Sequence, residues 1–286
     1  MLRTQIFRRV TIIGVGLMGG SLGLAIKKHS LAQEVVGVSQ QQSTLLAAVK
    51  CGAIDQAQTD MAQALRNAEL VVLATPVETI AKLFPIINPH IRRGCIVTDL
   101  GSTKELIVEA AEKHLSNSPF FVGSHPLIGS EKRGVDNARA ELFENAQCIM
   151  TPTDKSNQVA KEKIKFLWTK IGAKITFLTP KEHDEILGFT SHLPHLLAYG
   201  MMETIPDKYL TYASQGLKDT TRIAASSPQM WNEICLANSK NIIKALDESI
   251  KNFSSLRKAM INRDQQTIIQ HFTKAKEKRD GLAANP

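Results

Sequence analysis

The first half of the chain alternates short runs of apolar, often β-branched residues with longer segments whose apolar positions recur at helical spacing. Short apolar runs bounded by turn residues are typical of buried strands, and their alternation with helices is typical of a parallel sheet covered by helices. The pattern therefore predicts an α/β fold. The expected strands are Val10–Val15, Val35–Val38, Leu70–Ala74, Ile96–Asp99, Phe120–Val122 and Cys148–Met150, extended by a helix at Asn157–Ile171 and a strand at Lys174–Leu178.

The pattern changes after Thr179 and Pro180, where strand-like runs stop. Helical periodicity covers most of the remaining chain, in the segments Glu182–Glu203, Lys208–Ala225, Met230–Asn252 and Phe253–Arg279. We therefore expect a domain boundary near residue 180, with an α/β domain at 1–180 and an all-helical domain at 181–286. Because long amphipathic helices bury their apolar stripes, the second domain should close a cleft against the sheet, pair with a second copy, or do both.

Composition indicates a globular chain and excludes several classes of protein. Of the 286 residues, 43% are hydrophobic and 22% are charged, as in ordinary folded domains. No apolar run approaches the roughly 18 residues of a membrane helix, and the apolar N-terminal segment leads into a glycine-rich loop rather than a signal cleavage site. The four cysteines show neither CxxC pairing nor metal-ligand spacing, so we expect reduced thiols, a cytoplasmic protein and no metal site.

The net charge of +8 comes from dispersed Lys and Arg residues, which are densest at Lys274, Lys276, Lys278 and Arg279. Nucleic-acid binding favours a basic stripe with stacking aromatic residues, and aromatic residues make up only 5% of this chain. We therefore expect neither nucleic acid nor membrane as a partner. An excess of positive charge would suit a small polyanionic substrate.

A glycine-rich loop follows the first expected strand. Gly14-x-Gly16-x-x-Gly19 stands between that strand and a helix running to about Lys28, which is the context in which such a motif binds a dinucleotide. Gly14 permits a tight turn, Gly16 lets the backbone approach a pyrophosphate, and Gly19 allows close helix–sheet packing. The helix N-terminus then offers free N–H groups to the phosphates. Together these features predict a Rossmann-like domain.

The end of the second strand leaves the choice of dinucleotide open. An NAD-specific fold usually carries Asp or Glu there, whereas this chain has Ser39 and Gln40, followed by no arginine that would attract a 2′-phosphate. We therefore expect NAD or NADP, without a preference. The predicted cofactor-binding set also includes Leu17 and Met18 in the glycine loop, and Thr75 and Pro76 after the third expected strand.

Other candidate residues lie at strand ends and on the expected helices, and each has a structural alternative. Ser102, in Asp99-Leu-Gly-Ser-Thr-Lys104, can cap the helix expected from Thr103. His125, in the segment GSHPLIGSEKRG, can be a structural histidine. His192 and His195 share a helix face and can be a core or surface pair, since no third metal ligand stands at a matching spacing. Arg222 can form a surface salt bridge.

Taken in order, the segments GVGLMGGSLG, DLGSTK, GSHPLIGSEKRG, SHLPH and GLKDTTR resemble the prephenate/arogenate (cyclohexadienyl) dehydrogenases of tyrosine biosynthesis over nearly the whole chain. The resemblance implies a Rossmann-like domain, a helical dimerisation domain and an active site in the cleft between them. It also implies a monofunctional enzyme, since the sequence has room for neither an added sensing domain nor a mutase segment.

The resemblance implies the chemistry as well. Hydride would leave the substrate carbon that carries the 4-hydroxyl, and the ring carboxylate would depart as carbon dioxide. Neutral His125 would accept the hydroxyl proton, and Ser102 would bond the same hydroxyl or His125. Arg222 would bind a substrate carboxylate with Lys218 one helical turn away, and His195 and His192 would line the pocket. Ser130 stands where the family often has threonine, which leaves the choice of prephenate or arogenate open.

Two other functions compete with this interpretation. The β-hydroxyacid dehydrogenases also join a Rossmann domain to helices, but the catalytic lysine and nearby asparagine of that class do not appear here, and His125-Pro126 stands in their place. A non-catalytic nucleotide sensor would not need the set His125, Ser102 and Arg222.

Overall fold

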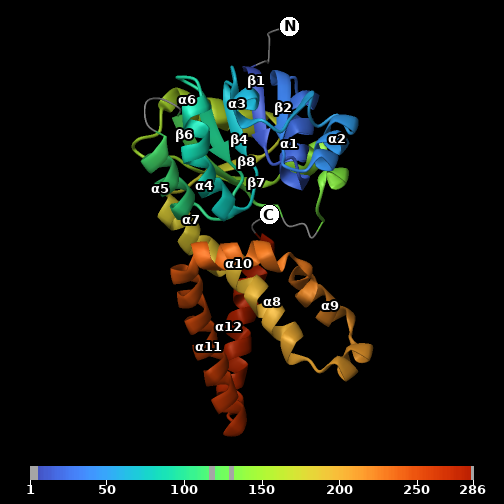
Figure 1. The fold of residues 1–286 in the computed structure, drawn as a ribbon. Coiled ribbons are helices and arrows are strands. Elements are labelled where there is room, and N and C mark those ends of the chain that lie inside the picture. The colour runs from blue at the N-terminus through green and yellow to red at the C-terminus, as the bar shows by residue number, and fades with distance from the viewer. Residues whose placement is uncertain (1–5, 116–119, 129–131, 285–286) are drawn as a thin grey trace. The chain divides into compact units, whose positions relative to one another are not determined.

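The computed structural model describes residues 6–115, 120–128 and 132–284. The chain divides into two compact units, Met1–Ser239 and Lys240–Pro286. An eight-stranded sheet in the order β3-β2-β1-β4-β5-β6-β7-β8 forms the centre of the first unit (Figure 1). Its strands are β1 (Phe7–Ile13), β2 (Ala32–Val38), β3 (Gln56–Gln58), β4 (Leu70–Leu73), β5 (Ile96–Asp99), β6 (Phe120–Pro126), β7 (Gln147–Thr151) and β8 (Lys174–Phe177).

The strands from β3 to β6 pair in parallel, whereas β7 runs antiparallel to β6 and β8 runs parallel to β7. This confirms the predicted α/β fold with a mostly parallel sheet. The sequence analysis did not predict β3, because this edge strand has three residues, Gln56–Gln58, and contains no apolar run.

Alternating residues of the central strands bury side chains on both faces of the sheet, as a covered parallel sheet requires. In β1, Val10 and Ile12 point into one core and Ile13 into the other. The first core is completed by α1 (Leu17–Lys28), α2 (Gln42–Lys50) and α6 (Gln158–Lys170), and the second by α3 (Met61–Leu65), α4 (Val77–Ile87) and α5 (Glu105–His114).

After β8 the first unit is helical. It contains α7 (Pro180–Leu187), a π-helical turn (Gly188–His192), α8 (Leu193–Thr204), α9 (Gln215–Thr221) and α10 (Pro228–Ala237), with 3₁₀ turns at Asp207–Tyr212 and Arg222–Ala225. A capping box between Thr179 and Glu182 begins α7. The π turn interrupts the single helix predicted over Glu182–Glu203. It directly precedes Pro194, which cannot donate to the carbonyl of Thr190 as an α-helix requires.

The second unit holds most of α11 (Ser239–Ile261) and all of α12 (Gln265–Ala284). The single helix predicted over Met230–Asn252 is wrong, because α10 ends at Ala237 and α11 begins at Ser239, with Asn238 between them. The predicted start of a new helix at Phe253 is also wrong, since α11 continues to Ile261 and the turn falls at Arg263, which has φ of 54°. Neither turn contains glycine or proline, and the sequence analysis did not use the weaker local signals, Asn238 and the capping residue Asp264.

Candidate active site

The candidate site lies at the carboxyl-terminal edge of the parallel strands. Gly14 follows β1, Thr75 follows β4, the segment Leu100–Lys104 follows β5, and His125 belongs to the end of β6. These strands are neighbours in the sheet, and the order of the sheet reverses between β1 and β4. Ligands of open α/β sheets bind outside the carboxyl ends of the strands at such a reversal.

The glycine loop has the backbone geometry that the motif predicts. Gly14 has φ of +96°, and a Cβ there would lie 2.7 Å from the carbonyl oxygen of Ala74. A Cβ on Gly19 would lie 2.0 Å from the carbonyl oxygen of Gly14, so α1 can approach the sheet only with glycine at this position. A Cβ on Gly16 would meet nothing within 4 Å, and no side chain caps α1 at this residue. The loop therefore presents open backbone and uncapped N–H groups, which suit a phosphate.

The segments beside the glycine loop also fit a dinucleotide. Thr75 contacts the loop, and its buried hydroxyl has no hydrogen-bond partner among the described residues, so a ligand could satisfy it. Half-buried Ser39 and exposed Gln40 follow β2 directly, and the Ser39 hydroxyl accepts a hydrogen bond from the backbone N–H of Gln41. Neither side chain is charged. Leu17 and Met18 pack against the first core, and Pro76 begins α4 as its N-cap.

Replacing Gly16 with alanine separates cofactor binding from folding. The backbone angles of Gly16 (φ −77°, ψ −152°) allow alanine and its Cβ meets open space, so we expect an unchanged melting temperature. The new methyl group would stand where the pyrophosphate approaches. We therefore expect the Kd for the dinucleotide to rise at least about tenfold, roughly 1.4 kcal/mol. Calorimetric titration measures this Kd. Gly19→Ala, the matched control, should lower the melting temperature instead.

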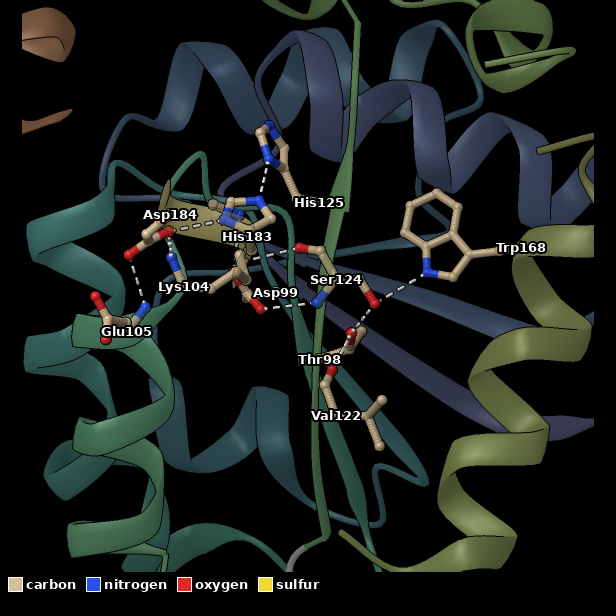
Figure 2. Close-up of polar contacts among 11 residues, drawn as sticks. Thr98, Asp99, Lys104, Glu105, Val122, Ser124, His125, Trp168, His183 and Asp184 are labelled. Carbon is tan, nitrogen blue, oxygen red and sulfur yellow. Dashed lines mark hydrogen bonds and ion pairs between the residues drawn. The ribbon is translucent and has the colours of Figure 1, made fainter. Parts of the chain in front are cut away.

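His125 is the first member of a buried hydrogen-bonded chain. Its Nδ1 lies 2.8 Å from Nε2 of His183, and Nδ1 of His183 lies 2.7 Å from Oδ1 of Asp184 (Figure 2). His183 and Asp184 belong to α7, whereas His125 belongs to β6. The first contact therefore joins the sheet to the helices that follow it.

The carboxylate of Asp184 caps α5. It accepts the backbone N–H of Lys104 at 2.7 Å and that of Glu105 at 2.9 Å, at a helix end where the macrodipole favours negative charge. The alternative in which Ser102 caps a helix starting at Thr103 is wrong. The helix begins at Glu105, and its cap comes from α7 rather than from the adjacent sequence.

A buried ion pair lies next to the hydrogen-bonded series His125–His183–Asp184. The Lys104 ammonium pairs with Oδ2 of Asp99 and donates to the carbonyl oxygen of Ser124 at 3.0 Å. Asp99 also accepts the backbone N–H groups of Gly101 and Ser124, at 2.8 and 3.2 Å. Both charged side chains are fully buried. They tie the turn after β5 to the strand segment that carries His125 (Figure 2).

Burial keeps His125 and His183 neutral. It lowers the pKa of His125 well below its ordinary 6.5, and the nearby His183, Lys104 and His192 lower it further. The pKa of His183 falls to about 2 by burial first, then by the charge of Lys104 and by His192. Burial raises the pKa of Asp184, against the effect of the two backbone N–H groups that it accepts. At neutral pH His125 is therefore a neutral imidazole, with one ring nitrogen protonated.

His192 joins the same network through Asn238. The amide nitrogen of Asn238 donates to the backbone oxygen of Asp184 at 2.7 Å and lies 3.1 Å from Nδ1 of His192. Burial lowers the pKa of His192 to about 4, while the backbone of Ser102 is among the groups that raise it. Ser102 therefore lies near His192, whose buried Nε2 has no hydrogen-bond partner among the described residues. His192 is buried, so a surface position is excluded for it.

His195 lies against Trp231. The two rings stack with centroids 3.9 Å apart and an interplanar angle of 26°, and Nδ1 of His195 donates to the carbonyl oxygen of Ser191 at 2.9 Å. Burial, and to a smaller extent the charge of Arg222, lowers the pKa of His195. Arg222 is therefore close enough to act on this ring. Arg222 follows α9 directly in the sequence and is exposed.

The last two predicted substrate-binding residues are Lys218 and Ser130. Lys218 is exposed in the last turn of α9, one turn before Arg222. Ser130 lies outside the described residues. Over the described ranges, no group of three or more His, Cys, Asp or Glu side chains is arranged to hold a metal ion, and no helix has the length and apolar character needed to span a membrane.

The sequence analysis missed His183, Asp184 and Asn238, and it did not recognise the pairing of Lys104. The hydrogen bonds of these residues join parts of the sequence that lie far apart. His125 and His183 are 58 residues apart, and Lys104 and Asp184 are 80 residues apart. The only local signal was the adjacent His-Asp pair at the start of a helix, a pair that is common on exposed helix faces.

Comparison with known proteins agrees with this architecture. The family model described as "Prephenate dehydrogenase, nucleotide-binding domain" matches residues 22–177, and "Prephenate dehydrogenase, dimerization domain" matches residues 179–274. The chain is 36% identical to a prephenate dehydrogenase of Bacillus subtilis, covering 96% of this chain and 76% of the relative. It is 32% identical to a cyclohexadienyl dehydrogenase of Zymomonas mobilis, covering 97% of each.

Among solved structures, prephenate dehydrogenase from Aquifex aeolicus in complex with hydroxyphenyl propionate and NAD⁺ superposes with a TM-score of 0.90. That match has 30% identity and covers 96% of this chain and 98% of the other. A mostly parallel sheet with an open glycine loop after β1 and a buried neutral histidine three strands away, at the end of β6, fits a dinucleotide-dependent oxidoreductase. Within this class, the chain belongs to the prephenate dehydrogenase family.

Proposed function

We propose that the protein catalyses the oxidative decarboxylation of prephenate, arogenate or both, with hydride transfer to NAD or NADP. The products are 4-hydroxyphenylpyruvate from prephenate and tyrosine from arogenate. The observation that carries the proposal is the position of His125. It is a buried, neutral imidazole whose Nδ1 is held by His183, at the same carboxyl-terminal edge of the sheet as the predicted cofactor loop.

The reaction needs a proton acceptor and a hydride acceptor. A bound oxidised nicotinamide would supply the acceptor for the hydride that leaves the carbon bearing the 4-hydroxyl, and the glycine loop after β1 would hold its dinucleotide. The hydroxyl proton passes to Nε2 of His125 as the C–O bond gains carbonyl character. The bond between the ring and its carboxylate then breaks to release carbon dioxide, its electron pair completes the aromatic ring, and the resulting phenolate recovers the proton from Nε2 of His125. Proton transfer to a positioned base contributes about 10²–10⁴ in rate.

Ser102 and His192 complete the hydroxyl side of the proposed site. Ser102 follows β5 at the same sheet edge as His125 and lies near His192. Its hydroxyl bonds the substrate 4-hydroxyl or His125 and so fixes the direction of proton transfer. His192 is buried and restrained by Asn238, so it lines the pocket and holds the turn that carries Ser102.

Arg222, Lys218 and His195 form the proposed carboxylate side. The Arg222 guanidinium can form two parallel hydrogen bonds to a carboxylate, and it acts electrostatically on His195. Trp231 stacks on His195 and restrains this ring against the pocket. Lys218 adds a second positive charge one turn away. By the family resemblance, Ser130 would belong to the hydroxyl side.

Arg222→Gln should mainly raise the KM. Loss of a hydrogen bond to a charged group costs about 1.5–3 kcal/mol, equivalent to roughly 10- to 150-fold in KM, while kcat changes little because His125 is untouched. Steady-state kinetics with the preferred substrate measures both constants. The control is Arg66→Gln, which removes the same charge at an exposed position just before β4, at the opposite edge of the sheet. An unchanged KM in Arg222→Gln would contradict the assignment.

We also propose that residues 1–180 bind the dinucleotide and residues 181–286 hold substrate and form a homodimer. The dimer is supported by the family of the second matched domain and by exposed apolar side chains on α11 and α12, namely Ile243, Ile250, Phe253, Met260, Ile261, Ile269, Phe272 and Leu282. A monomeric mass in analytical ultracentrifugation would contradict the dimer.

Initial rates of NADH or NADPH formation test the proposed reaction. The purified protein is assayed with prephenate and with L-arogenate, each in the presence of NAD⁺ or NADP⁺. Turnover in any of the four mixtures supports the proposal and identifies the preferred substrate and cofactor together. If the folded protein binds a dinucleotide but turns over neither substrate, the proposed reaction is wrong.

A further inference from the structure

We infer that His183 and Asp184 are positioning residues, which hold His125 in the tautomer that presents the lone pair of Nε2 to the substrate. The inference rests on the proposed function for its kinetic consequences, but the tautomer itself is a property of the folded protein. It follows from the donors and acceptors along the chain Asp184–His183–His125 (Figure 2).

The direction of the hydrogen bonds is set at Asp184. Both of its carboxyl oxygens accept backbone N–H groups, from Lys104 and Glu105. A backbone N–H can only donate, and the positive end of α5 lies beside the carboxylate, so this arrangement favours the ionised form. An ionised carboxylate is an acceptor only. The proton in the 2.7 Å contact between Asp184 and His183 therefore belongs to Nδ1 of His183.

This proton fixes the other nitrogen of His183. The ring is fully buried and neutral, because burial and the charge of Lys104 disfavour a second proton. A neutral imidazole carries one N–H, so Nε2 of His183 must be an acceptor. The 2.8 Å contact with His125 then requires Nδ1 of His125 to be the donor.

The same step fixes His125. Because its Nδ1 carries the proton, its Nε2 holds a lone pair, which is the state that a general base needs. In the proposed reaction the substrate proton forms a bond to Nε2, and the Nδ1–H bond stays intact. The resulting imidazolium remains hydrogen-bonded to Nε2 of His183, whose own N–H points to the Asp184 carboxylate.

The surroundings explain why such support is needed. Two titratable groups near His125 are His183 from α7 and His192 from the π turn. The others are the ion pair of Asp99, the last residue of β5, and Lys104, which follows that strand. The Lys104 ammonium opposes a positive charge on His125. A carboxylate aligned through His183 favours that charge during turnover and keeps the ring from rotating.

Nuclear magnetic resonance tests the tautomer directly. Long-range ¹H–¹⁵N correlations of the full-length protein, with ¹⁵N-labelled histidine rings, distinguish a protonated from an unprotonated ring nitrogen at neutral pH. The resonances of His125 and His183 are assigned from their absence in His125→Asn and His183→Gln. We expect both residues to be protonated at Nδ1 and bare at Nε2. A His125 ring protonated at Nε2 would overturn the inference, whatever the enzyme's substrate.

Two substitutions at His183 test the kinetic consequence. His183→Leu fills much of the same space but cannot accept a hydrogen bond, so His125 loses its restraint. An imposed wrong tautomer in a comparable His–carboxylate arrangement costs about 10⁴ in kcat; for a tautomer merely left unrestrained we expect a loss on the order of 10², with little change in KM. His183→Gln retains an oxygen acceptor for Nδ1–H of His125 and should recover most of that kcat.

The control is His90→Leu, the same change at an exposed histidine, which should leave kcat unchanged. Full kcat in His183→Leu, or equal losses in the leucine and glutamine variants, would overturn the positioning role. If His183→Leu does not fold, the glutamine variant and the tautomer measurement decide. Lack of turnover by the wild-type protein would instead refute the proposed reaction, and the resonance measurement would still test the tautomer.

Discussion

Replacing His125 with asparagine is expected to lower kcat by about 10²–10⁴, the contribution of a positioned general base, and to leave dinucleotide binding unchanged. The asparagine amide nitrogen can occupy the place of Nδ1 and keep the hydrogen bond to His183, so the fold is retained. What disappears is Nε2, the atom that accepts the substrate proton. Single-turnover rates of hydride transfer, together with the Kd for the dinucleotide, measure the two effects separately.

His125→Gln provides the complementary variant. Its amide reaches the position of Nε2 but is not basic, so it should lose turnover while keeping substrate KM closer to the wild-type value. Turnover similar to the wild type in either variant would exclude His125 as the base.

The pH profile of the wild-type enzyme follows from the same assignment. A base must be unprotonated to act, so kcat/KM falls as pH drops through the pKa of His125 in the free enzyme. Burial lowers that pKa well below 6.5. The acidic limb of the profile should therefore lie below pH 6.5, and activity should persist where an exposed histidine would already be protonated.

The second large effect is on stability. Asp99→Asn should lower the free energy of unfolding by about 3–5 kcal/mol, because removing one partner of a buried ion pair leaves the other charge uncompensated. Lys104 is fully buried and would lose its counter-charge, while the asparagine amide nitrogen would have to face a donor, either Lys104 with the Gly101 N–H or the Ser124 N–H. Denaturant unfolding followed by circular dichroism measures the change.

Two further variants separate this explanation from simple loss of packing. Asp99→Asn combined with Lys104→Met removes both charges and should be more stable than Asp99→Asn alone. Glu78→Gln breaks the pair with Lys82, whose side chains are 59% and 70% exposed, and should change stability very little. A double variant as unstable as the single one would show that the ammonium charge is not the cause.

Local sequence predicted the parts of this protein that local physics controls. All seven expected strands and the glycine loop lie where the sequence placed them, because short apolar runs and the conformational freedom of Gly14 depend on near neighbours. His125 could be located at a strand end for the same reason. The helix boundaries at Asn238 and Arg263 were predicted wrongly, because neither turn contains glycine or proline and the capping residues Asn238 and Asp264 were not recognised.

The sequence by itself determined an α/β fold with a dinucleotide-type loop, and it marked His125, Ser102 and Arg222 as candidates. Only the tertiary structure decided what surrounds His125. The packing of α7 against α5 and β6 brings Asp184 to a helix N-terminus and His183 to Nδ1 of His125. Burial then removes the water that would otherwise solvate these groups. Because burial and long-range hydrogen bonds arise only when distant segments meet, no reading of neighbouring residues could assign the protonation state on which this site depends.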